Sequence, residues 1–152
     1  MKALRFLGIL FIFAVGTSTS FAVEWFTDFA AAQEKAAQEN KAIFLFFTGS
    51  DWCPYCMMAD KQWFSTDEFS RVAEKYLVCV LLDFPRDKSK QSDSLKAQND
   101  ALNRAYKVEG FPTIILLRSD GTHPERFGFT GIPVEDFCSQ ILRAIAKAKL
   151  AK

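Results

Sequence analysis

The stretch "TGSDWCPYCMM", residues 48–58, decides the fold because it places two cysteines where one hydrophobic pattern changes into another. The preceding run "AIFLFFT", residues 42–48, is continuously apolar and of strand length, which is typical of a central strand buried on both faces. The pattern that follows predicts a helix running to about Phe64. Cys53 then lies where a strand turns into a helix. Pro54 occupies the first helical position, where a missing N–H costs nothing.

A helix that begins in this way favours redox chemistry at Cys53. Unpaired backbone N–H groups and the positive end of the helix dipole are expected to face its sulfur and to favour the thiolate, which is the attacking species. Cys56 lies one turn further on the same face, close enough to form a disulfide and more shielded. The spacing therefore predicts attack by Cys53, a mixed disulfide and its resolution by Cys56. Trp52 is expected to cover the site from one side.

Other roles for the sulfur atoms stay open on the residues alone. A structural zinc site needs four ligands, but the chain has no second CxxC and only one histidine, His123, so no metal is expected. A permanent structural disulfide between Cys53 and Cys56 would stabilise the fold little, because it closes too short a ring to remove much conformational entropy from the unfolded chain. Cys79 and Cys138 are expected to be buried, inert thiols, although an oxidising compartment permits their pairing. Met57 and Met58 are expected to pack on their helix rather than to bind copper.

A second signal, "EGFPT" at residues 109–113, falls where a predicted helix ends and a strand begins. The simplest interpretation of Pro112 is an ordinary trans proline that ends a loop, because cis X–Pro bonds are uncommon. In a cis turn facing the cysteines, however, it would expose the backbone of Phe111. A substrate peptide could then pair there as an added strand, with its sulfur near Cys53.

Helical and strand patterns alternate along the rest of the chain. The expected elements are a short strand near 23–26, a helix over 27–40 capped by Thr27, the strand 42–48, the helix after Cys53, a helix opened by a Ser65–Glu68 capping box, a strand over 76–84, a polar loop over 85–94, a helix over 95–108 ended by Gly110, two strands about an Asp120–Gly121 turn, and a last helix with Pro133 at its first position. Strands separated by helices imply parallel crossovers, and the hairpin adds an antiparallel edge. The prediction is a three-layer α/β/α sandwich with a mixed central sheet and a C-terminal β-hairpin plus helix.

The first 22 residues have the pattern of a secretory signal peptide. Two basic residues precede an apolar run, and small residues at 20 and 22 fit cleavage after Ala22. An uncleaved membrane anchor is the alternative. Polar residues at 17–20, however, interrupt the ~20-residue apolar segment that a membrane-spanning helix requires. Residues 23–152 then form one domain of ordinary size.

The charge of this domain excludes a nucleic-acid surface. Removal of Lys2 and Arg5 from the 19 basic residues leaves 17, which against 18 acidic residues gives a net charge of −1. No basic field remains for nucleic acid, and the chain has no block of like charge.

The order of strand, CxxC, helix, proline and hairpin resembles the thioredoxin superfamily over essentially all of residues 23–152. "FLFFTGSDWC", "LLDFP" and "YKVEGFPT" are most similar to exported thioredoxin-like proteins of the DsbH type. The resemblance implies Cys53 as nucleophile, Cys56 as resolving cysteine, a redox-active Cys53–Cys56 disulfide, and Pro112 as a cis-proline. It places substrate binding on five neighbours of these residues, namely Trp52, Pro54, Tyr55, Phe111 and Thr113.

The same resemblance implies a function. We expect a periplasmic thiol-disulfide oxidoreductase acting as a protein-disulfide reductase, without a cofactor, as a monomer on disulfide-containing or thiol proteins. A membrane electron donor of the DsbD type would recharge it, because NADPH does not reach that compartment, and the signal segment alone would contact the membrane. Two alternatives stay open: a thiol oxidase of the DsbA type, and a redox-silent module that binds peptides.

Two departures from the family pattern affect the chemistry. Thioredoxins proper carry a buried acid six residues before the first cysteine, whereas this chain has Phe47 there. The proton of Cys56 must therefore move through Asp51, Asp60 or water, and the sequence does not select among them. The dipeptide between the cysteines is Pro-Tyr, as in glutaredoxins, which by itself implies no glutathione site.

Overall fold

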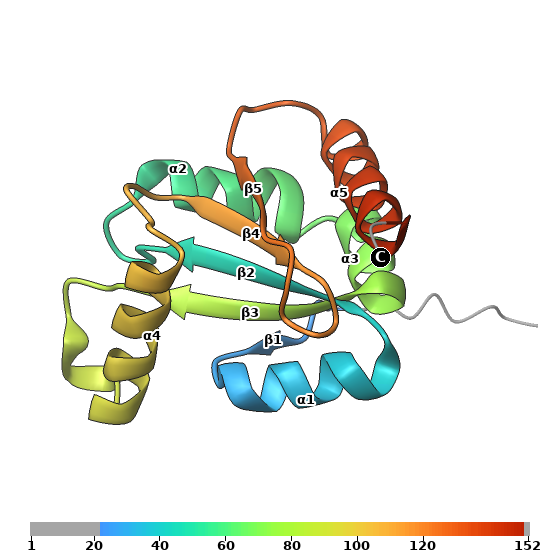
Figure 1. The fold of residues 1–152 in the computed structure, drawn as a ribbon. Helices are drawn as coiled ribbons and strands as arrows, with labels where there is room; N and C mark the ends of the chain where they lie inside the picture. Colours follow the sequence, from blue (N-terminus) through green and yellow to red (C-terminus); the bar gives the residue numbers. More distant parts are fainter. Residues whose placement is uncertain (1–21, 151–152) are drawn as a thin grey trace, which may run out of the picture.

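A computed structural model describes residues 22–150, drawn in colour in Figure 1. The predicted signal peptide lies, except for Ala22, outside the described residues. Within the described part, no helix combines the length and the apolar character needed to cross a membrane.

Five strands form one mixed sheet in the order β1-β3-β2-β4-β5. β2 runs parallel to β3, and β3 parallel to β1, whereas β4 runs antiparallel to both β2 and β5. The strands are β1 Trp25–Phe26, β2 Ala42–Thr48, β3 Leu77–Asp83, β4 Thr113–Leu117 and β5 Glu125–Gly128. The turn between β4 and β5 uses Gly121 at φ 80°, a conformation that glycine adopts freely, so the predicted hairpin is confirmed.

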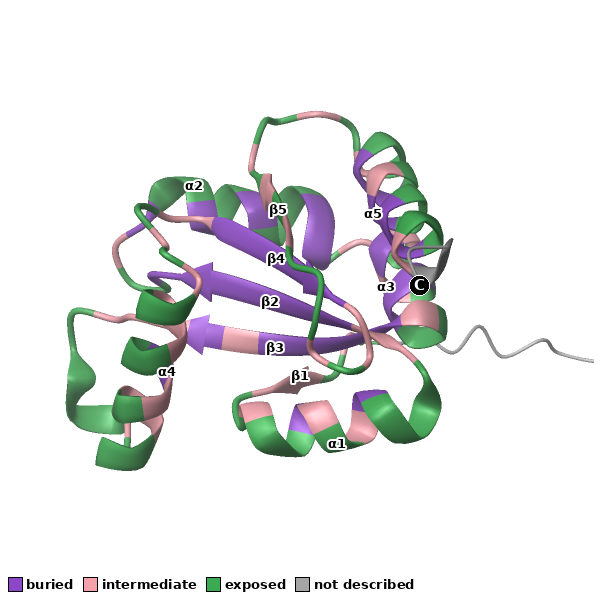
Figure 2. Cartoon of the chain, in the orientation of Figure 1, coloured by how far each residue is buried: buried purple, intermediate pink, exposed green. Residues whose placement is uncertain are grey.

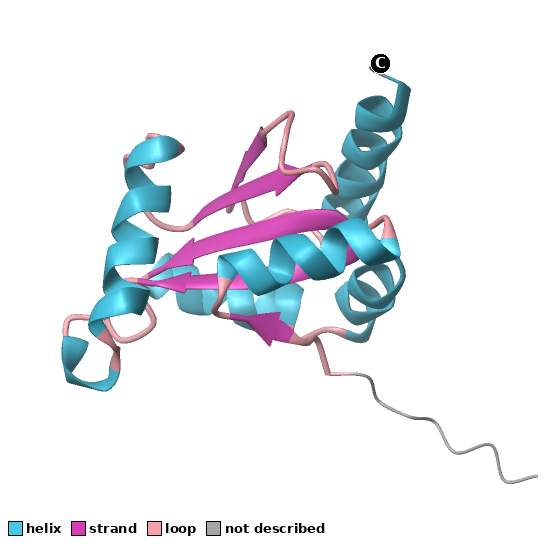
Figure 3. Ribbon diagram, turned by 60° about the horizontal axis from the view of Figure 1, so that its bottom comes forward, coloured by secondary structure: helices cyan, strands magenta, loops and turns pink. Residues whose placement is uncertain are grey.

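Helices cover both faces of this sheet, which confirms the predicted three-layer arrangement (Figures 1 and 3). α1 and α4 pack on one face, while α2, α3 and α5 pack on the other. The helical segments are α1 Phe29–Glu39, α2 Pro54–Ala59, the π-helical turn η1 Asp60–Phe64, α3 Asp67–Tyr76, the 3₁₀ turn η2 Lys88–Lys90, α4 Asp93–Ala105 and α5 Val134–Leu150.

The central strand β2 divides the apolar core in two. Phe44 and Phe46 point to the face covered by α2, α3 and α5, whereas Ile43, Leu45 and Phe47 point to the face covered by α1 and α4. This alternation follows from the two-residue period of a strand. Residues 43–48 of β2 are buried and Ala42 is half-buried, in agreement with the continuous apolar sequence, and Figure 2 shows β2 as mostly buried.

Three predicted helix ends are wrong by one to several residues, each for a local reason. Asp28, not Thr27, caps α1, because its carboxylate accepts the Ala31 N–H at 3.0 Å. α4 ends at Ala105 rather than near Gly110, and Lys107 then takes a left-handed φ of 49°. α5 begins at Val134, after Pro133 rather than on it.

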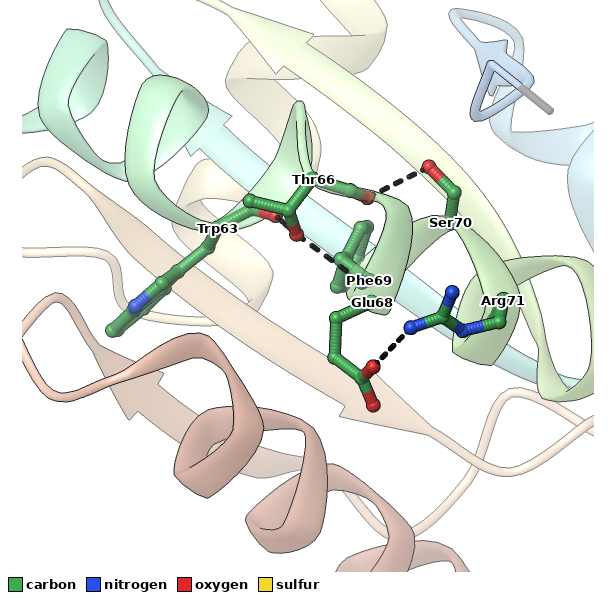
Figure 4. A network of polar contacts seen from close by, with 6 residues as sticks. All are labelled: Trp63, Thr66, Glu68, Phe69, Ser70 and Arg71. Carbon is green, nitrogen blue, oxygen red and sulfur yellow. Dashed lines mark hydrogen bonds and ion pairs between the residues drawn. The ribbon is translucent and has the colours of Figure 1, made fainter. Parts of the chain in front are cut away.

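The start of α3 also differs from the predicted Ser65–Glu68 capping box (Figure 4). Thr66 is the N-cap, and its hydroxyl accepts the Phe69 N–H while donating to the Trp63 carbonyl. Glu68 instead pairs with Arg71. Thr66 thus links the end of the helix that carries the cysteines to the start of α3.

Candidate redox site at the start of α2

Cys53 and Cys56 are joined by a disulfide, with their Cα atoms 5.2 Å apart. Cys53 is the N-cap of α2 and Pro54 its first residue, as the sequence predicted. The Cys56 N–H donates to the Cys53 sulfur across 3.2 Å. The helix start therefore directs a backbone donor at this sulfur, an arrangement that stabilises a thiolate after reduction.

Both sulfurs lie at a nearly closed surface. Cys53 is 3% exposed and Cys56 2%, so the two residues are shielded to nearly the same extent in the oxidised state. A partner sulfur must reach Cys53 past its neighbours. Among the residues next to it, Tyr55 is 63% exposed.

Trp52 forms one wall of the site and is held on several sides. Its indole N–H donates to the Phe84 carbonyl at 2.8 Å, and its ring meets that of Phe111 edge-to-face at 5.6 Å. The Arg86 guanidinium lies 5.9 Å from the ring centre. The indole also lies so close to Gly49 that a Cβ atom there would overlap its Cε2 atom. Gly49 thus leaves the space that the indole occupies.

The two residues before Trp52 tie the site to the segment that follows β3. Ser50 donates its N–H and its hydroxyl to the Asp83 carboxylate, at 2.9 and 2.7 Å. The Asp51 carboxylate accepts the N–H groups of Arg86 and Asp87, at 3.0 and 3.3 Å. The hydrogen bond from the Arg86 N–H lowers the pKa of Asp51 below its usual value, and the hydrogen bond from the Asp87 N–H lowers it further. The sequence does not indicate these bonds, because their partners lie 33 to 36 residues away in the chain.

The second predicted segment lies against this wall. The Phe111–Pro112 peptide bond is cis, and the Phe111 ring contacts both Trp52 and Phe84. Thr113, the first residue of β4, is buried, and its hydroxyl donates to the Gly110 carbonyl at 2.7 Å. The ring contact between Trp52 and Phe111 therefore brings the CPYC loop and the Phe111–Thr113 turn together.

No buried acid accompanies the cysteines in the described chain. Phe47 is fully buried in the opposite half of the core, stacked 6.5 Å from Phe84. Among residues 22–148, the buried polar side chains are Thr48, Asn99 and Thr113, none of them acidic. Asp51 and Asp60 are both exposed.

Cys79 and Cys138 are free and buried, each 2% exposed. Burial raises the pKa of both thiols, that of Cys138 to about 11. Over the described part of the chain, no group of three or more His, Cys, Asp or Glu side chains is placed to hold a metal ion. The disulfide is therefore the chemical feature that the structure assembles at the helix start.

Comparison with known proteins points to one group. The model of a thioredoxin-like domain matches residues 29–145. The disulfide bond reductase DsbH of Chlamydia pneumoniae is 37% identical over 107 residues, 70% of this chain and 63% of the relative. The thioredoxin-related protein DsbJ of the same organism is 28% identical over 112 residues, 74% of this chain but 32% of the relative. A solved DsbH oxidoreductase matches with a TM-score of 0.80 at 30% identity, covering 91% of this chain and 95% of that one.

Proposed function

The chain belongs to the thioredoxin-like family, and on this basis we propose that it is a thiol-disulfide oxidoreductase that reduces disulfides of periplasmic proteins. The observation that carries the proposal is the Cys53–Cys56 disulfide at the start of α2, with the Cys56 N–H directed at the Cys53 sulfur. The similarity to a reductase at 37% identity supports the direction of electron flow.

The chemistry is two successive thiol-disulfide exchanges. The Cys53 thiolate attacks one sulfur of the substrate disulfide, and the other substrate sulfur leaves as a thiolate that takes up a proton. Cys56 then loses its proton to water or to a surface carboxylate and attacks the Cys53 sulfur. The mixed disulfide breaks, the substrate leaves as a dithiol, and the Cys53–Cys56 disulfide is restored.

Each turnover leaves the protein oxidised by two electrons, so it needs an external donor. We propose a membrane electron carrier of the DsbD type, reached after export and cleavage behind Ala22. A monomer suffices for this exchange, since both cysteines come from one chain. N-terminal sequencing of protein from the periplasmic fraction tests the export step, with Val23 as the expected first residue.

Substrate contact is proposed for the residues that border Cys53. Trp52 and Phe111 form the wall beside it, while Pro54 and Tyr55 are exposed on the helix start. The hydroxyl of Thr113 is engaged with Gly110, so its proposed contribution comes from the backbone next to Pro112. An extended substrate pairing with this backbone would hold its sulfur near Cys53.

Insulin reduction in the presence of dithiothreitol tests the activity. Wild type and Cys138→Ser should accelerate the reaction, and Cys53→Ser should lose that acceleration because it has no nucleophile. Equal activity of wild type and Cys53→Ser would overturn the proposal. The redox equilibrium with glutathione then tests the direction: a disulfide more stable than that of glutathione fits a reductase, while an easily reduced one identifies an oxidase.

A further inference from the structure

The first turn of α2 exposes large apolar side chains to solvent. Within residues 22–148, the exposed large hydrophobic residues are Tyr55 (63%), Met57 (48%), Met58 (42%) and Leu142 (37%). Three of these four lie within five residues of Cys53. Met57 and Met58, expected to pack on their helix rather than to bind copper, are thus only about half buried, and an exposed apolar cluster beside a reactive sulfur requires an explanation.

These side chains lie on one side of α2. At 100° per residue, Met57, Pro54, Met58 and Tyr55 follow one another over an arc of about 160° around the helix. Cys56 and Ala59 occupy the opposite, buried side. No charged residue interrupts positions 52–59; Asp51 precedes this stretch, and Asp60 and Lys61 follow it. Figure 2 shows the outer side of α2 as exposed. We call Pro54, Tyr55, Met57 and Met58 the α2 apolar surface.

The position of this surface determines what can cover it. A substrate joined to Cys53 by a disulfide has its own cysteine Cα within ~4.4–6.8 Å of that of Cys53. The Met57 N–H bonds to the Cys53 carbonyl at 3.1 Å, so Met57 lies one helical turn, about 6 Å, along the axis. A residue that flanks the substrate cysteine on the side of α2 is therefore within reach of the α2 apolar surface.

We propose that Met57 and Met58 are docking residues for protein disulfides whose cysteines are flanked by apolar side chains. Such cysteines are interior ones, which a misfolded or unfolded protein exposes. The absence of charge over 52–59 favours apolar over acidic or basic flanks. Methionine is unbranched and flexible, so it packs against apolar groups of many shapes. This inference rests on the proposed reductase function and specifies its substrate class.

Two synthetic peptides test the proposal, each with one disulfide. In one, leucine and valine flank both cysteines; in the other, serine and glycine do. The double variant Met57→Gln/Met58→Gln keeps the side-chain length but adds polarity, and Leu142→Gln is the matched control on α5. We expect the double variant to lose about tenfold in kcat/KM on the apolar peptide, which corresponds to ~1.4 kcal/mol. It should change less than twofold on the polar peptide, and its redox equilibrium with glutathione should be unchanged.

Other results overturn the inference. Equal loss on both peptides, or a shifted glutathione equilibrium, would place the methionines in the chemistry of the dithiol rather than in docking. Unchanged kinetics on both peptides, with slower reduction by the membrane donor, would assign the surface to the donor. A loss of the same size in Leu142→Gln would remove the special role of α2.

Failure of the proposed function is distinguishable from failure of this inference. A wild type that reduces neither peptide contradicts the reductase function. Docking is then measured directly, by fluorescence titration with dye-labelled peptides whose cysteines are replaced by serine. Tighter binding of the apolar peptide to wild type than to the double variant supports docking, and equal binding contradicts it.

Discussion

Two regions of the molecule bury cysteine to the same extent but give it opposite properties. Cys53 and Cys56 lie where a loop becomes a helix, and Cys79 lies in the middle of β3 between β1 and β2. All three are 2–3% exposed, as is Cys138 on α5. The backbone N–H groups near Cys79 are used in the parallel ladders, whereas the Cys56 N–H at the start of α2 donates to the Cys53 sulfur as well as to the Cys53 carbonyl. A backbone donor directed at its sulfur, rather than its degree of burial, distinguishes Cys53 from the two free thiols.

Alkylation of the reduced protein is the strongest way to break this comparison. A pKa of about 11 gives Cys138 a hundredfold smaller thiolate fraction near pH 7 than the ordinary value of 9.0, and burial limits access further. Because the helix start favours the Cys53 thiolate, we expect Cys53 to react with iodoacetamide at least about a hundredfold faster than Cys138. Peptide mass spectrometry over a time course measures both rates. Comparable rates would show that the helix start does not set the reactivity.

Denaturation provides the control for this experiment. In urea the four thiols lose their separate surroundings, so their labelling rates should converge. A Cys138 that still reacts slowly when the chain is unfolded would attribute its inertness to its sequence neighbours rather than to the core.

A second prediction concerns how the wall beside Cys53 is held. Gly49→Ala places a Cβ against the Trp52 indole, so the indole must move and its bond to the Phe84 carbonyl is strained or lost. Overpacking of this kind costs roughly 1–3 kcal/mol of unfolding free energy. In a Trp52→Ala background the indole is absent, so Gly49→Ala should leave the unfolding free energy nearly unchanged. Urea unfolding of the oxidised proteins measures the four members of this cycle.

Gly110→Ala is the matched control, since a Cβ atom at Gly110 would meet nothing within 4 Å. It should change stability by less than about 0.5 kcal/mol, as surface substitutions usually do. If Gly49→Ala lowers the unfolding free energy as much in the Trp52→Ala background as in wild type, the backbone of the turn requires the glycine. The indole would then not be the reason for glycine at this position.

The fold was largely predictable because its main signals are local. β2 is apolar along its whole length, which only a central strand of a covered sheet requires. Pro54 and Gly121 likewise mark a helix start and a turn through their own backbone preferences. The helix caps were missed by one residue at Asp28 and at Thr66, because adjacent residues in each case can all serve as caps.

The surroundings of the site were less predictable because they depend on contacts distant in sequence. Nothing near Ser50 or Asp51 indicates that their partners are Asp83 and Arg86. The exposure of Met57 has a similar cause: helical periodicity shows which residues share a face, but not which part of a helix other elements leave uncovered. Here the outer side of the first turn of α2 faces solvent (Figure 2).

The smallest expected effect concerns Asp51, which ties the loop before Cys53 to Arg86 and Asp87. Its pKa is lowered in the folded protein, so the carboxylate stabilises the fold above the unfolded value of about 3.9, and this contribution is lost as the pH falls through the lower folded value. Asp51→Asn cannot titrate. Its urea midpoint should therefore lie below that of wild type at pH 7, and the difference should shrink below about pH 4.

The matched control for Asp51 is Asp60→Asn, because both carboxylates are exposed and flank the same short helix. Only Asp51 accepts N–H groups from the segment after β3, so only its substitution should give a difference between wild type and variant that shrinks with acid. The same pH dependence in both variants would mean that the general charge of this region, not the bonds to Arg86 and Asp87, holds the loop. The surroundings of Cys53 would then owe their order to the Ser50–Asp83 and Trp52–Phe84 bonds, which do not depend on Asp51.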